Sequence, residues 1–173
     1  MSQFAIVTCV LSLVIFSSFL ALSIWRFGWL GSYSGYAAKW TEFLSLGGNI
    51  HTWSIVTMAV AVLLCFSTIE AGDESPLQFL GFFAPVYLGV VALTPKWESD
   101  KKQKTIHYIG TFLCAVAAIL WLILVLRLWF YIPIALALTF IAAYFTKTIK
   151  TSYFLWLEIA LFAAVYGALL IGG

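Results

Sequence analysis

The chain has 173 residues, of which 64% are hydrophobic and only 9% are charged. A soluble domain carries about a quarter charged residues, so this composition excludes a soluble globular protein and indicates one whose solvent is lipid. The net charge is only +2 and no long polar stretch occurs, so the sequence offers neither a nucleic-acid-binding patch nor room for a soluble domain.

The first apolar run covers residues 4–25 and predicts an uncleaved membrane-spanning helix. A secretory signal peptide has basic residues before its apolar core, whereas here the first basic residue, Arg26, follows the run. The next segment places Tyr36, Trp40 and Phe43 at helical spacing among several glycines. Because Trp and Tyr favour the membrane interface, we expect a short amphipathic helix lying in that interface.

Five further apolar runs predict spanning helices with short connections, in a single all-α transmembrane domain that covers residues 1–173. They cover residues 51–69, 77–94, 105–126, 128–146 and 152–172. Small residues recur at four-residue spacing in two of them, as Gly81, Pro85 and Gly89, and as Ala160, Ala164 and Ala168. Such stripes let membrane helices approach closely. Since Pro85 removes a helical N–H donor, we also expect a neighbouring group to satisfy the freed carbonyl.

The basic residues between the predicted helices indicate the orientation. Of the nine Lys and Arg residues, all but Arg127 fall in the first, third and fifth connections. Cytoplasmic loops carry an excess of such residues, so we expect a multi-pass cell-membrane protein with both termini outside the cytoplasm. On the other side, Glu70, Asp73 and Glu74 could meet Arg127, although a solvated acidic turn is the simpler interpretation.

The three cysteines, Cys9, Cys65 and Cys114, each lie inside an apolar run. An odd number in such positions argues against a disulfide framework. We expect them to pack as small hydrophobic side chains, with a Cys9–Cys65 pair as a minor alternative.

Polar groups inside a membrane are costly and mark candidate sites, and this chain has few of them. Glu158 is the one acid well inside a predicted span, while His51 and His107 open two other spans on the same side of the membrane. The sequence therefore predicts a ligand-binding or proton-carrying pocket at the cytoplasmic mouth of the bundle, where a histidine would titrate near neutral pH. The alternative is that the histidines only meet water or lipid phosphate and that Glu158 hydrogen-bonds locally.

Two short motifs extend the set of candidates. SYSGYAAKW occupies residues 32–40, and TIHYIGT occupies residues 105–111 at the start of the fourth predicted helix. This layout resembles a set of small, uncharacterised bacterial six-helix membrane proteins that are distantly similar to the damage-regulated autophagy modulator-like proteins. The resemblance implies a six-helix fold, and the positions that match its motifs are Ser32, Tyr33, Ser34, His107 and Tyr108.

Three functions fit these features. We favour a non-catalytic protein that binds membrane lipid, a small molecule or a protein partner through the cytoplasmic-side pocket. The second is a small-solute or ion transporter or channel that uses Glu158, although transport paths usually show more polar lining. The third is a lipid-modifying membrane enzyme, which no complete catalytic motif supports. No metal or cofactor is expected, because no spacing typical of such a site occurs, and the oligomeric state stays open.

Overall fold

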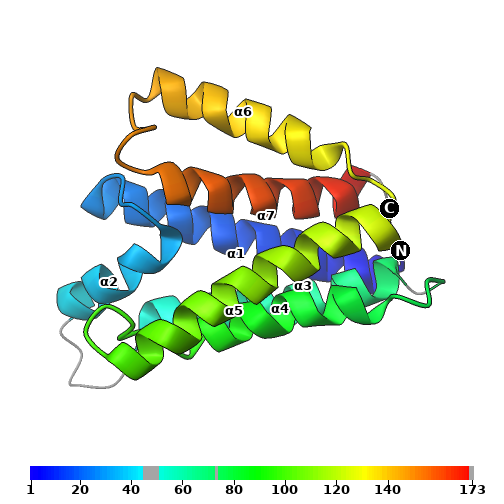
Figure 1. The fold of residues 1–173 in the computed structure, drawn as a ribbon, viewed down its shortest axis with the longest axis horizontal. Helices are drawn as coiled ribbons and strands as arrows, with labels where there is room; N and C mark the ends of the chain where they lie inside the picture. Colours follow the sequence, from blue (N-terminus) through cyan, green and yellow to red (C-terminus); the bar gives the residue numbers. More distant parts are fainter. Residues whose placement is uncertain (45–50, 73, 172–173) are drawn as a thin grey trace.

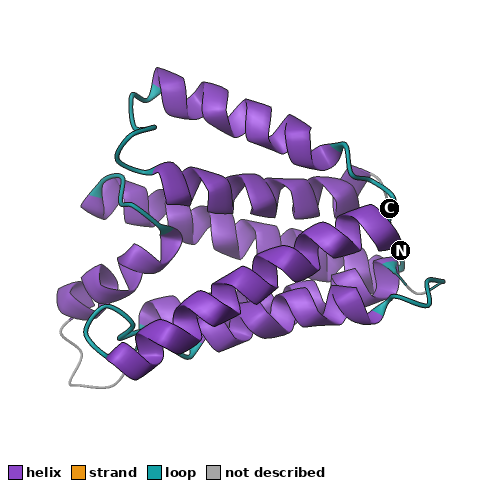
Figure 2. Ribbon diagram, in the orientation of Figure 1, coloured by secondary structure: helices purple, strands orange, loops and turns teal. Residues whose placement is uncertain are grey.

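In the computed structural model, residues 1–44, 51–72 and 74–171 are described, and within these ranges the regular elements are all helical (Figures 1 and 2). The long helices are α1 (Gln3–Phe27), α3 (Thr52–Ala71), α4 (Phe79–Ala92), α5 (Lys101–Leu120), α6 (Tyr131–Phe145) and α7 (Tyr153–Ile171). They run beside one another in alternating directions, so the start of α1 and the last turn of α7 lie at the same end of the bundle (Figure 1).

Four of these helices, α1, α3, α5 with its extension to Val125, and α7, are long and apolar enough to cross a bilayer. The predicted all-α fold is therefore confirmed for the described residues, and four of the six predicted spans have a helix of sufficient length and hydropathy. The helices α4 and α6 have only 14 and 15 residues, which rise about 21 to 23 Å against a bilayer core of about 30 Å. Turns at Pro76 and Arg127 shorten the third and fifth predicted spans. The predicted end of the last span, residue 172, lies outside the described residues.

The helix α4 packs against α3 through its stripe of small residues. A Cβ atom added to Gly81 would lie 2.7 Å from the backbone oxygen of Thr68, so the two helix backbones are in close contact there. The Thr68 hydroxyl donates a 2.6 Å hydrogen bond to the Gly81 carbonyl, which is the group that Pro85 leaves without a helical donor. The predicted close approach and the predicted satisfaction of the freed carbonyl are both confirmed.

A π-helical turn, η2 (Trp121–Val125), extends α5. Its side chains pack where α3 ends and α4 begins. An added Cβ on Gly81 would lie 2.7 Å from Nε1 of Trp121, and one on Gly72 would lie 2.9 Å from Cγ1 of Val125. These two glycines leave room for the side chains of η2, which fix this end of α5 in place.

The helix α2 (Tyr36–Leu44) and the preceding 3₁₀ turn η1 (Tyr33–Gly35) cover the opposite end of α1 and α3. A short helix is thus present where one was predicted, while its position in the membrane interface stays a prediction. The side chains of Tyr36 and Trp40 are buried. The indole N–H of Trp40 donates a 2.8 Å hydrogen bond to the Ser23 hydroxyl of α1. Tyr36 and Trp40 of the predicted apolar stripe thus face the bundle, whereas Phe43 is exposed.

On the other side, α7 lies between α1 and the outermost helix, α6 (Figure 1). The predicted packed face of α7 is confirmed, since Ala160, Ala164 and Ala168 are all buried. Within the described part of the chain, all three cysteines are free thiols, so the minor alternative of a Cys9–Cys65 disulfide is not formed.

Candidate functional site

The carboxylate of Glu158, in the apolar helix α7, meets the first connection of the chain. One of its oxygens, Oε2, accepts a 2.7 Å hydrogen bond from the backbone N–H of Tyr33. The turn η1 that presents this N–H is capped by Ser32, whose hydroxyl accepts from the N–H of Gly35 at 3.2 Å. The phenol oxygen of Tyr33 in turn accepts from the Thr57 hydroxyl of α3 at 3.2 Å. Through these hydrogen bonds of Tyr33, η1 connects α3 to α7 beside Glu158.

The Tyr33 side chain is itself almost completely buried. Burial raises the pKa of its phenol well above the ordinary value, and the nearby Glu158 carboxylate raises it further. The phenol therefore stays neutral at physiological pH and keeps its proton as a hydrogen-bond donor.

The predicted candidate His107 is also buried, with 3% of its surface exposed. Its Nδ1 and the Thr94 hydroxyl are hydrogen-bonded at 2.9 Å, and the Trp97 ring stacks on the imidazole with 4.8 Å between ring centroids. Trp97 also donates from Nε1 to the backbone oxygen of Ser34 at 3.3 Å. His107 therefore holds the α4–α5 connection against η1, which is the geometry of a packing residue.

Of the other candidates, some line a cavity with Glu158 and some do not. Ser34 lies beside Ser32, with their hydroxyl oxygens 3.2 Å apart. His51 begins α3, where its Nδ1 is hydrogen-bonded to the Thr41 hydroxyl at 3.2 Å, and Tyr108 is exposed. Glu158, Tyr33 and Ser34 line one cavity, whereas the structure places His51 and Tyr108 away from its lining.

That cavity, of about 480 Å³, lies between α3, α4, α5 and α7, and its volume falls within the range of small-molecule sites, about 300–1,000 Å³. Its walls are apolar and include Leu64, Leu88, Val91, Leu157, Leu161 and Val165. Along α7 it extends from Phe154 to Val165, a rise of about 16 Å. It is therefore a narrow apolar slot with Glu158 near one end.

The slot opens toward the outer surface between α5 and α7. These two helices are closest at the end that holds the termini and diverge toward the other end (Figure 1). Phe112 of α5 and Phe154 of α7 line the cavity, yet they are 67% and 68% exposed. Because this outer surface is apolar, a molecule dissolved in the membrane could enter the slot laterally, between α5 and α7.

Three polar atoms in the cavity wall have no hydrogen-bond partner within the described ranges. They are Nε1 of the buried Trp53, Nε1 of the buried Trp121 and Oγ1 of Thr111. Leaving such a group unpaired costs about 1–3 kcal/mol, so all three are available to the polar atoms of a ligand. None of these residues stood out in the sequence, although Thr111 closes the second motif and would have been found by following that motif along its helix.

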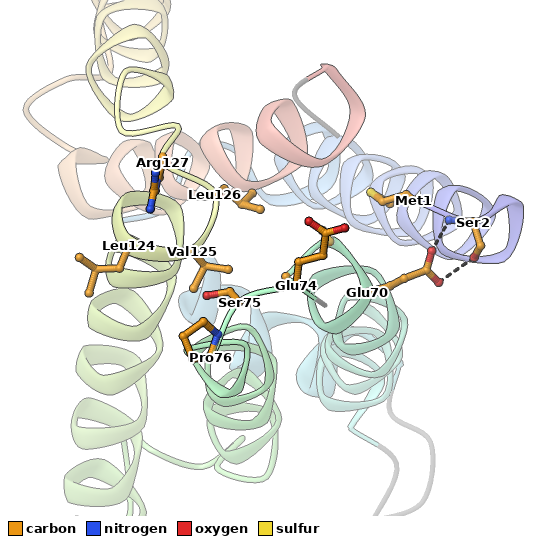
Figure 3. A pocket seen from close by; sticks show the side chains of 12 residues that line it. Met1, Ser2, Glu70, Glu74, Ser75, Pro76, Leu124, Val125, Leu126 and Arg127 are labelled. Carbon is orange, nitrogen blue, oxygen red and sulfur yellow. Dashed lines mark hydrogen bonds between the residues drawn. The ribbon is translucent and has the colours of Figure 1, made fainter.

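A second hollow, of about 650 Å³, lies at the end of the bundle that holds the termini (Figure 3). Both carboxylate oxygens of Glu70 bind Ser2, one at its backbone N–H and one at its hydroxyl. Glu74 and Arg127 also line the hollow, but within the described chain no salt bridge joins Arg127 to either acid. The solvated turn is thus the better interpretation of Glu70 and Glu74, and Asp73 lies outside the described residues.

No known protein family, curated protein sequence or solved structure matches this chain. Within the described ranges, no three His, Cys, Asp or Glu side chains come close enough together to hold a metal ion. The fold and the slot define the class, a helical membrane protein with a cavity among its helices.

Proposed function

We propose that this protein is a multi-pass membrane protein that binds an amphipathic, mainly apolar molecule in the slot between α3, α4, α5 and α7. The observation that carries the proposal is the apolar cavity of about 480 Å³ with the Glu158 carboxylate in its wall. A hydrocarbon chain would fill the length of the slot, since burial of apolar surface requires no specific polar partner. The polar end of the molecule would then lie beside Glu158.

The proposed arrangement in the membrane has six crossings, with α4 and α6 as short spans. The alternating directions of the six long helices support this count (Figure 1). The charge of the connections supports an orientation with both termini outside the cytoplasm, because positive charge concentrates on cytoplasmic loops. In this arrangement α2 lies at the cytoplasmic interface, and Glu158 lies near the cytoplasmic end of the slot.

Binding explains the site better than catalysis or transport does. An enzyme with a nucleophilic serine needs a base within hydrogen-bond reach, but the Ser34 hydroxyl lies beside Ser32 and His107 is hydrogen-bonded to Thr94. A transport path needs polar groups that continue toward the other face, whereas the slot beyond Glu158 is mainly apolar. A binding role requires only the cavity and its single carboxylate.

Native mass spectrometry of the protein, purified in a mild detergent, tests the binding proposal. We expect a discrete apolar molecule to be retained, and we expect Ala115→Phe, which places a ring in the slot, to lower retention at least about tenfold, or about 1.4 kcal/mol. The matched control is Ala137→Phe on the exposed face of α6, which should retain the molecule as the unmodified protein does. A bare unmodified protein, or equal retention by both variants, would contradict the proposal.

A further inference from the structure

Among the described residues, the carboxylate of Glu158 has no cationic partner. The hydrogen bond that it accepts there comes from the uncharged backbone N–H of Tyr33, and the salt bridge found within the same ranges joins Lys39 to Glu42 at the surface. An ionised carboxylate away from bulk water is costly unless it is paired. Acidic residues in membrane helices accordingly pair with another charge or mark a ligand pathway.

The groups around Glu158 would stabilise a positive charge. Tyr33, Trp53 and Phe162 line the same cavity, and the rings of Tyr33 and Trp53 lie 5.8 Å apart between centroids. A cation near the face of such a ring is attracted by its electrons, with Trp as the strongest partner. The unpaired hydroxyl of Thr111 could also accept a hydrogen bond from an ammonium group.

We propose that the ligand of the slot is a lipophilic organic cation, such as an amine-bearing lipid, with its positive charge at Glu158 and its apolar body directed toward Trp121. This inference rests on the proposed function and adds the chemical class of the ligand. A neutral molecule would leave the carboxylate without a cationic partner, and an anionic one would be repelled by it. The charge of the ligand, rather than its shape alone, therefore determines which apolar molecules bind.

Two probes of similar size and opposite charge, tetraphenylphosphonium and tetraphenylborate, test this inference by calorimetric titration of the whole protein in a neutral detergent. We expect the phosphonium to bind at least about tenfold more tightly than the borate. Glu158→Gln should remove that preference. The matched control, Glu74→Gln at the other end of the bundle, should leave the preference unchanged.

The variant Ala115→Phe separates failure of this inference from failure of the proposed function. If both probes bind equally and Ala115→Phe weakens both, the slot binds apolar molecules without regard to charge, and only the cationic ligand is overturned. If Ala115→Phe weakens neither probe, binding is elsewhere and both proposals fall. Should Glu158→Gln not fold, Glu158→Asp keeps the charge and must keep the phosphonium preference, and loss of that preference would overturn the inference.

Discussion

Replacing Gly81 by Ala is expected to lower the free energy of unfolding by about 3 kcal/mol. The added Cβ would lie 2.7 Å from both the backbone oxygen of Thr68 and Nε1 of Trp121. A helix backbone cannot yield as a flexible side chain can, so α3 and α4 must move apart. That movement would also break the hydrogen bond from the Thr68 hydroxyl to the Gly81 carbonyl. Denaturant unfolding of the purified protein in detergent, followed by circular dichroism, measures the loss.

The matched control is Gly89→Ala, two turns further along the same stripe of α4. Its added Cβ would lie 3.5 Å from the sulfur of Met58, which is an ordinary contact with an adaptable side chain. Because alanine favours a helix over glycine by about 0.5–1 kcal/mol, this variant should be neutral or slightly stabilised. Equal losses in the two variants would contradict the close packing of α3, α4 and η2 at Gly81.

The two histidines are expected to differ strongly when each is replaced by alanine. His107→Ala removes the stacking on Trp97 and the hydrogen bond to Thr94, and it leaves a buried cavity, so it should cost about 3 kcal/mol of stability. His51→Ala removes a hydrogen bond to Thr41 that is exposed to solvent, so its cost should stay within about 0.5 kcal/mol. Thermal unfolding of the two variants side by side measures both effects.

Ligand retention provides a second reading of the same pair of variants. If His107 is a packing residue, His107→Asn, which keeps a polar group at this position, should recover part of the stability, and its effect on ligand retention should follow its effect on folding. A His107 variant that folds with full stability and yet loses the ligand would contradict the packing role. It would place this histidine in the binding site.

The sequence predicted those features of the fold that depend on local pattern. The stripe of Gly81, Pro85 and Gly89 indicated a close helix contact because small side chains at four-residue spacing share one face. The freed carbonyl was predictable because proline removes a donor wherever it occurs in a helix. The lengths of α4 and α6 were not predictable in this way. The apolar sequence continues into the turns near Pro76 and Arg127, so hydropathy does not show where the helices begin.

The candidate site was predictable only in part. Glu158 stood out because an acid in an apolar helix is conspicuous, and topology placed it on the same side as Tyr33 and Ser34. The hydrogen bond from the Tyr33 backbone to Glu158 depends on how η1 folds back onto the bundle, which no local pattern shows. The slot itself depends on how α3, α4, α5 and α7 pack together, and that packing also brings Trp53 into its wall.

Photo-crosslinking tests the central claim, that the slot between α5 and α7 binds an apolar molecule. The protein would be reconstituted in phosphatidylethanolamine and phosphatidylglycerol vesicles that contain a lipid with a photoreactive acyl chain. We predict crosslinks on slot residues such as Leu157 and Leu161, and their loss in Ala115→Phe. Crosslinks confined to outward-facing residues such as Leu138 of α6, unchanged in that variant, would show that lipid only surrounds the protein and would contradict the claim.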